Sequence, residues 1–235
     1  MRRRVKGNVE GMASTRAKTK AGARCPEDIL RATKEPDFRQ ERSRRSYLAL
    51  IEAATDLFSK DGYDSVGTPE IAQRAGVSVG TFYRYFDDKH EVYLEIARRS
   101  MVAAYAETIE GLTPARFEGL ARRETIEHTV TLLFEHVLDR PRLSRSFSEM
   151  SLRDPQVAEL RRAFEQISVS RLTELISTII PRDIVADPEA TAWVIYGSAM
   201  QCAYGLAEHL GPAPIDSVRA KKALTDFIER ALFPT

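Results

Sequence analysis

The sequence has few cysteines and few histidines, and this shortage excludes several classes of protein. Its 235 residues include 2 cysteines and 4 histidines. Cys25 and Cys202 form neither a regular framework nor a CxxC pair, so we expect no disulfide scaffold and no metal site. Neither the HExxH spacing nor a P-loop is present, so no catalytic residue, enzyme activity or cofactor is expected. A reducing cytoplasm is the expected compartment.

The sequence also has no long hydrophobic run. Its longest stretch without a charged residue, 190–207, has 18 residues and only just reaches the length of a membrane span. Polar residues and two glycines interrupt this stretch, and no cluster of Lys or Arg flanks it. The basic start of the chain is not followed by the apolar segment of a secretory signal. We therefore expect neither a membrane span nor export.

Charge is balanced over the whole chain but uneven along it. The 35 Lys and Arg and the 34 Asp and Glu give a net charge of +1. Residues 1–46 alone carry 14 basic and 6 acidic side chains, a local excess of +8. Because residues 1–42 also have few large apolar side chains, we expect a mostly disordered tail, with room for one short helix at 27–33. Such a tail either contacts DNA phosphates or is simply solvated.

From Ser43 onward, apolar residues recur at the 3.6-residue period of helices. Gly62 has the position of a C-terminal helix cap, and later prolines and glycines separate further helical stretches. No stretch alternates between apolar and polar residues in the way that a strand does. The pattern predicts an all-α fold of about nine helices, over residues 43–62, 68–76, 79–85, 88–111, 120–139, 142–152, 155–180, 188–210 and 216–232.

Residues 68–89 have the pattern of a helix-turn-helix DNA reader. Thr68 and Ser78 are predicted N-caps of two short helices, and Phe82 is predicted to pack into the core beneath the second. On the other face of this helix, Arg84 can donate two hydrogen bonds to a guanine edge. Hydroxyls and the ammonium of Lys89 can bind phosphates on either side.

In order and spacing, residues 46–95 resemble the DNA-binding region of the tetracycline-repressor (TetR) family. The resemblance rests on the segments FSKDGYDSV, TPEIAQRAGVSVGTFYRYF and DDKHEVY. It implies a homodimeric transcriptional regulator, usually a repressor, that a small molecule releases from a double-stranded DNA operator. Position by position, it implies base contacts from Val79, Gly80, Thr81, Tyr83 and Arg84, and phosphate contacts from Thr68, Ser78, Tyr83, Tyr85 and Lys89. Val79 departs from the family pattern, because a polar residue often occupies its place.

We accordingly divide the chain into a basic tail at 1–42, a helix-turn-helix domain at 43–89 and an effector-binding and dimerisation domain at 90–235. Apolar helix faces in the last part can enclose a cavity for a largely apolar effector, with candidate residues Phe134, Phe147, Met150, Phe164, Arg171 and Trp193. Arg171 falls within an apolar stripe, so its guanidinium needs a partner. The partner is a carboxylate such as Glu135 or Glu149, an anionic group of the effector, or water reached by snorkelling.

The helix expected at 188–210 is apolar or small on all sides, which predicts that both of its faces are covered. A glycine inside a helix costs about 1 kcal/mol relative to alanine, so Gly197 favours close approach of a partner helix. We predict a dimer interface formed by this helix and the last one, with candidate residues Gly197, Gln201, Tyr204, Glu208 and Phe227. The alternative is a monomer with Gln201 turned to water. The main functional alternative is a helical adaptor without sequence-specific DNA binding.

Overall fold

A computed structural model describes residues 25–31, 40–119, 121–209 and 211–234. Within these ranges the chain is all-helical and has no strand, which confirms the predicted fold class. The α-helices are α1 (Pro26–Arg31), α2 (Glu41–Asp61), α3 (Thr68–Arg74), α4 (Val79–Tyr83), α5 (Lys89–Tyr105), α6 (Ala121–Asp139), α7 (Pro141–Arg153), α8 (Pro155–Ile179), α9 (Pro188–Leu206) and α10 (Ser217–Leu232). A π-helical turn, Ala106–Glu110, continues α5, and a 3-10 turn, Pro114–Phe117, precedes α6.

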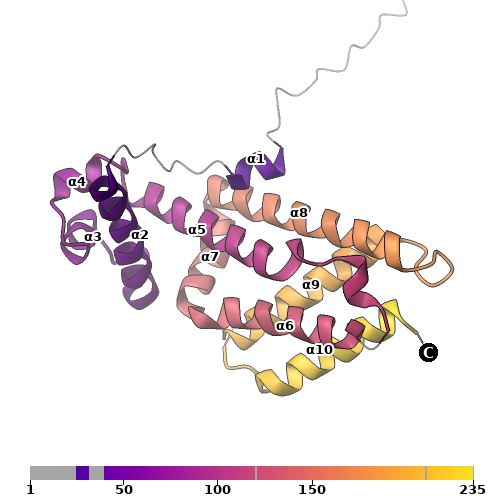
Figure 1. The fold of residues 1–235 in the computed structure, drawn as a ribbon. Helices are drawn as coiled ribbons and strands as arrows, with labels where there is room; N and C mark the ends of the chain where they lie inside the picture. Colours follow the sequence, from indigo (N-terminus) through magenta and orange to yellow (C-terminus); the bar gives the residue numbers. More distant parts are fainter. Residues whose placement is uncertain (1–24, 32–39, 120, 210, 235) are drawn as a thin grey trace, which may run out of the picture.

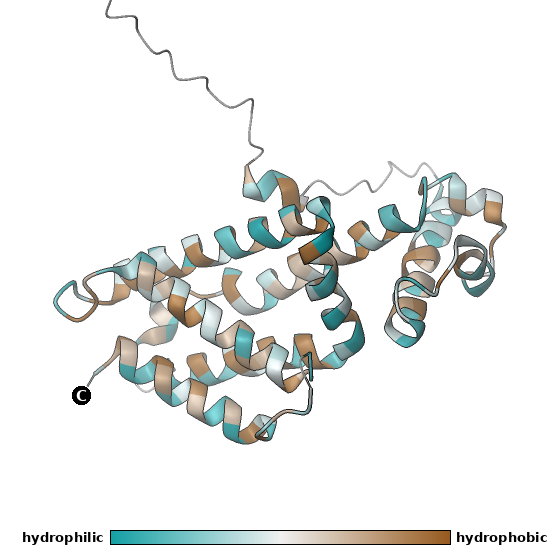
Figure 2. Cartoon of the chain, turned by 180° about the vertical axis from the view of Figure 1, so that it is seen from behind, coloured by the Kyte–Doolittle hydropathy of each residue, from teal (hydrophilic) through white to brown (hydrophobic). Residues whose placement is uncertain are grey.

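The helices form a small group and a larger body, and α5 runs from one to the other (Figure 1). The small group consists of α2, α3 and α4, and the larger body contains α6 to α10. Figure 2 shows hydrophobic and hydrophilic residues side by side along the long helices, as expected for amphipathic helices that share a core. No helix of the described residues is long and apolar enough to cross a membrane.

The core of the small group is rich in aromatic rings and continues into the larger body. Tyr47, Phe58 and Phe82 are almost completely buried in it. Tyr93, from α5, packs edge-on against Phe58, with 5.6 Å between the ring centroids. Met150, from α7, belongs to the same cluster. Helix α7 of the larger body is therefore packed directly against the small group.

Several helix ends differ from the sequence prediction by one to a few residues. Helix α2 begins at Glu41 instead of Ser43 and ends, as predicted, before Gly62. Gly67, not Thr68, caps α3, because its backbone N–H donates to the Glu70 carboxylate at 2.8 Å. Helix α9 ends at Leu206 instead of residue 210, because the backbone turns at Glu208, which has a φ of +56°.

The predicted basic tail lies mostly outside the described residues, which do not include 1–24 or 32–39. Between these two ranges, α1 packs on α5 and α8. Leu30 is buried there in a cluster with Leu160 and Phe164 of α8. The short helix that the sequence allowed at 27–33 therefore exists as α1, and its residues contact the larger body.

Candidate nucleic-acid interface and effector cavity

Local contacts fix the turn between α3 and α4. Gly76, between the two helices, has a φ of +68°, a conformation that favours glycine. The next backbone N–H, from Val77, donates to the Ala72 carbonyl at 3.0 Å. Ser78 then caps α4, and its Oγ accepts from the Thr81 N–H at 3.1 Å. The cap predicted at Ser78 is confirmed, and the helix-turn-helix unit is present.

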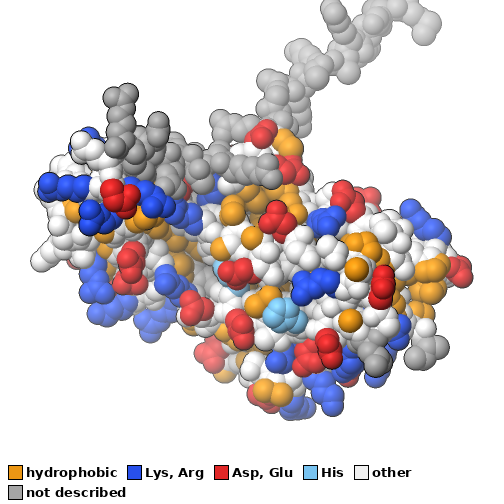
Figure 3. Space-filling view, in the orientation of Figure 1, with side chains coloured by type: hydrophobic (Ala, Val, Ile, Leu, Met, Phe, Trp, Pro, Cys, Tyr) orange, Lys and Arg blue, Asp and Glu red, His pale blue; other side chains and the backbone are white. Residues whose placement is uncertain are grey.

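Helix α4 has one buried side and one open side. Phe82 is fully buried and anchors the helix to the aromatic core. On the open side, Val79 is 39% exposed, Tyr83 is 54% exposed, and Gly80 and Arg84 are also exposed. The sequence-predicted base-reading residues therefore lie together, with the half-buried Thr81 among them. Figure 3 shows Lys and Arg side chains gathered on the surface over α2, α3 and α4, at the left of the view.

The predicted phosphate-binding residues have partners inside the chain. Thr68 Oγ1 lies 3.1 Å from the Tyr83 hydroxyl, which links the start of α3 to α4. The hydroxyl of Tyr85 donates to the Ser43 carbonyl at 3.1 Å. Lys89 Nζ donates to three backbone carbonyls of the α2–α3 loop, at 2.9 Å, 3.4 Å and 3.0 Å. In this structure Lys89 therefore braces that loop, a role that the sequence analysis did not anticipate.

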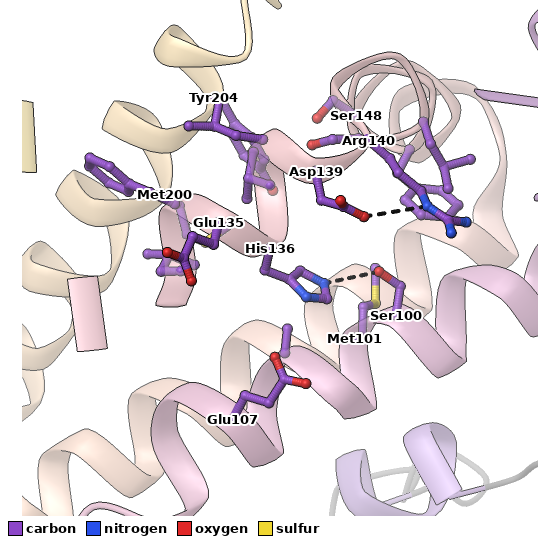
Figure 4. Close-up of a pocket in the computed structure, with 18 of the residues that line it drawn as sticks. Ser100, Met101, Glu107, Glu135, His136, Asp139, Arg140, Ser148, Met200 and Tyr204 are labelled. Atoms are coloured by element: carbon purple, nitrogen blue, oxygen red, sulfur yellow. Dashed lines mark hydrogen bonds and ion pairs between the residues drawn. The ribbon is translucent and has the colours of Figure 1, made fainter. Parts of the chain in front are cut away.

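The larger body contains a cavity of about 940 Å³. Its lining comes from α5 to α10 and also from α2, so the cavity reaches the small group of helices. Among the predicted effector residues, Phe134, Phe147 and Phe164 line it. Figure 4 shows the cavity with Ser148 and Tyr204 at the top of the view and Glu107 at the bottom.

Three of the predicted effector residues do not line this cavity. Met150 is buried in the aromatic core between α7 and the small group. Arg171 lies half-buried near the far end of α8, where its guanidinium donates to the Leu112 carbonyl at 3.0 Å and to Glu174 at 3.3 Å. Its partner is therefore a carboxylate, as one of the alternatives expected, but this carboxylate is Glu174 and not Glu135 or Glu149. Trp193 is 59% exposed and donates from Nε1 to Glu165 at 3.2 Å.

The cavity also has polar groups that the sequence analysis missed. His136 of α6 points toward α5, and its Nε2 lies 3.1 Å from Ser100 Oγ (Figure 4). Burial lowers the pKa of His136 below its ordinary value of 6.5, although Glu107 and Asp139 act in the opposite direction. Burial therefore favours the neutral form of its imidazole. Arg161 of α8 lines the cavity as well.

A regular spacing of residues in α9 could have identified the face that lines the cavity. Tyr196, Met200 and Tyr204 recur every four residues along α9 and all line it. Tyr204 had been predicted in the dimer interface, because it also follows Gly197 and Gln201 at helical spacing. The structure turns it inward, where burial raises the pKa of its hydroxyl.

The opposite face of α9 and the neighbouring face of α10 are open. Gly197, Gln201 and Glu208 are exposed. Phe227 of α10 is 46% exposed, and Trp193 contributes a second large apolar side chain from α9. Four of the five predicted interface residues therefore lie on the surface, with Trp193 as an addition. The sequence analysis had assigned Trp193 to the effector cavity instead.

Known proteins match both the sequence and the fold. Residues 50–96 match the family model "Bacterial regulatory proteins, tetR family". The HTH-type transcriptional activator FasR of Mycolicibacterium smegmatis is 28% identical over 135 residues, which are 57% of this chain and 58% of that protein. The HTH-type transcriptional repressor KstR of Rhodococcus jostii is 38% identical over 85 residues, which are 36% of each.

A solved structure extends the similarity to most of the chain. A TetR-family transcriptional regulator from Mesorhizobium loti has a TM-score of 0.61 and 20% identity, and the match covers 82% of this chain and 98% of that chain. Sequence similarity is shorter, since the matches span 43% and 58% of the length of two curated relatives. The relatives are named as transcriptional regulators, not as enzymes.

Proposed function

We propose that this chain, a member of the TetR family of bacterial regulatory proteins, is a DNA-binding transcriptional regulator that acts as a homodimeric repressor. In this proposal, residues 43–89 bind an inverted-repeat operator, and residues 90–235 form the dimer and hold a small, largely apolar effector. Effector binding releases the operator. A regulator of this kind acts where the DNA is, so the proposal places it in the cytoplasm.

The form of α4 supports the DNA-binding part of the proposal most directly. Phe82 anchors the helix, and its small residue Gly80 allows the backbone to approach a base pair closely. Arg84 is exposed at the end of α4, where it can donate two hydrogen bonds to a guanine in the major groove. Two such helices in a dimer would enter successive major grooves, with half-sites about 10 bp apart or slightly wider.

Selection of duplexes from a random pool, followed by fluorescence anisotropy at fixed salt, tests this assignment. The enriched duplexes should contain an inverted repeat, and Arg84→Ala should weaken binding by about 1–3 kcal/mol, or about 5- to 150-fold. Arg162→Ala is the matched control, because Arg162 is exposed on α8 in the larger body. Unchanged affinity and sequence preference in Arg84→Ala would refute the base-reading role. Equal affinity for the repeat and for a scrambled duplex would favour a helical adaptor.

We propose that the exposed faces of α9 and α10 form the dimer interface. Trp193 and Phe227 are large apolar side chains that are 59% and 46% exposed, and aromatic residues are enriched at the centres of interfaces. Phe227→Arg should convert the dimer to monomer in sedimentation velocity. Leu152→Arg is the control, since Leu152 is 88% exposed and belongs to α7 instead of α9 or α10. A Phe227→Arg protein that stays dimeric would place the interface elsewhere.

A further inference from the structure

Arg161 is the cavity-lining arginine that lacks a carboxylate partner among the described residues. Arg99 donates to Glu95 at 2.8 Å, and Arg140 forms an ion pair with Asp139 at 3.4 Å. The guanidinium of Arg161 has a hydroxyl partner instead, since its Nη1 donates to Ser151 Oγ at 2.9 Å. An arginine has five N–H donors in a planar fork, so one hydrogen bond leaves most of its donors available.

The groups around Arg161 form a polar region of the cavity that adjoins aromatic rings. Its guanidinium carbon lies 5.7 Å from the centre of the Tyr204 ring, and Ser148 of α7 lines the cavity beside them. Burial raises the pKa of Tyr204, and Glu165 acts in the same direction, while Arg161 and the Ser148 hydroxyl act in the opposite direction. From this region the lining continues to the apolar rings of Phe147 and Phe164.

We propose that Arg161 binds the carboxylate of the effector, and that the effector is an organic monoanion with an aromatic or aliphatic body. The inference rests on the proposed function, because it assigns the chemical class of the molecule that the cavity holds. A guanidinium fork matches a carboxylate in two parallel hydrogen bonds. The Ser148 and Tyr204 hydroxyls can donate to the same oxygens.

The rest of the lining favours a single negative charge. Glu107, Glu135 and Asp139 also line the cavity. These exposed carboxylates would oppose the second negative charge of a phosphate monoester or dicarboxylate, because like charges repel each other. Lys221, at the start of α10, is a second lining cation without a carboxylate partner in the described part of the chain. Arg161 is the better candidate because the aromatic rings and hydroxyls adjoin it.

The position of Arg161 also links ligand binding to DNA binding. Its partner Ser151 is on α7, the helix that packs against the small group. From α7, Ser146 contacts the Tyr93 hydroxyl of α5 at 2.9 Å, and Arg142 donates to the Lys60 carbonyl of α2 at 2.7 Å. A carboxylate that competes with Ser151 for Arg161 therefore changes a contact of α7. Such a ligand shifts the DNA-binding equilibrium by the difference between its affinities for the two states.

Calorimetric titration of the full chain with 4-phenylbutyrate and decanoate, each compared with its neutral amide, tests the proposal. We expect the wild type to bind at least one carboxylate about tenfold or more tightly than its amide. Arg161→Met should remove this preference for the carboxylate, and should leave the amide affinity within about twofold. Arg162→Met is the matched control, since the adjacent Arg162 is exposed on α8. Melting temperatures of both variants check that they fold.

Three results would overturn the inference: no binding of either carboxylate, equal binding of acid and amide, or loss of the preference in Lys221→Met but not in Arg161→Met. Operator binding by the wild type is measured separately by anisotropy. A chain that binds an inverted repeat but prefers no carboxylate contradicts only this inference. A chain that binds carboxylates but no specific duplex contradicts the proposed function instead.

Discussion

Asp154 contacts residues of both α8 and α5, and its replacement should show how much these contacts contribute to the free energy of unfolding. It lies between α7 and α8. Its Oδ1 accepts from the backbone N–H groups of Gln156 and Val157, both at 2.9 Å, and so caps α8. Its Oδ2 lies 2.9 Å from Nε2 of His90, in the first turn of α5. One carboxylate therefore caps a helix of the larger body and contacts α5, the helix that runs to the small group.

Asp154→Ala removes both functions of the carboxylate. Loss of an N-cap side chain costs about 0.5–2 kcal/mol, and loss of a further hydrogen bond costs about 0.5–1.5 kcal/mol. We therefore expect the free energy of unfolding to fall by about 1–3 kcal/mol, measured by urea denaturation at pH 7. Asp187→Ala is the matched control, because Asp187 caps α9 by accepting from the Ala190 N–H at 3.0 Å. A loss no larger than that of the control would refute a contribution from the His90 contact.

The pH dependence gives a second check on the same carboxylate. Burial opposes the charge of Asp154, but hydrogen bonds from Val157 N–H and the nearby His90 prevail and hold its pKa below the ordinary value of 3.8. A lowered pKa means that the stabilisation is present above the unfolded-state value and is lost as the pH falls through the folded-state value. The difference between wild type and Asp154→Ala should therefore shrink as the pH falls below about 4. A difference that grows in acid would contradict this reasoning.

Three further changes test the packing of Phe82, the contacts of Lys89 and the role of the basic tail. Phe82→Ala should lower the free energy of unfolding by about 3–5 kcal/mol, because it empties a fully buried aromatic site; a loss below 1 kcal/mol would contradict the packing. Lys89→Met should cost about 1–3 kcal/mol by leaving loop carbonyls without their donor, and unchanged stability together with weaker DNA binding would restore its role as a phosphate contact. Deleting residues 1–24, which carry eight Lys and Arg and one Glu, should flatten the slope of log K against log salt for duplex binding; an unchanged slope would mean that the tail is only solvated.

The sequence was most informative where structure depends on neighbouring residues. The cap at Ser78 and the helix end before Gly62 both follow from local hydrogen bonds and backbone preferences, and the structure has both. The open face of α4 was predictable for the same reason, since Phe82 fixes which side of a short helix is buried. Lys89 shows the limit of this reasoning, because its carbonyl partners lie more than twenty residues away in the sequence.

The cavity was harder to predict because an apolar stripe identifies the buried face of a helix but not what that face encloses. Arg161 and Arg171 are both on α8, about 15 Å apart along its axis at 1.5 Å per residue. Only Arg161 is at the level of the cavity, whereas Arg171 is near the edge of the body, beside Leu112. Which of the two faces a ligand depends on how α7 and α9 cross α8. That crossing is set by tertiary packing, which one sequence does not reveal.

Helix α7 contributes residues both to the cavity and to the core of the small group, so a change at the cavity can reach α2 through it. Phe147 lines the cavity on one side and packs edge-on against Tyr93 on the other, with 5.0 Å between the ring centroids. Tyr93 in turn contacts Phe58 of α2, at the centre of the aromatic core beneath α4. Because this core is close-packed, a ligand that displaces Phe147 cannot leave Tyr93 and Phe58 unchanged. Phe147→Leu should therefore uncouple the two sites, so that an effector still binds but no longer changes operator affinity, and retained coupling would refute this route.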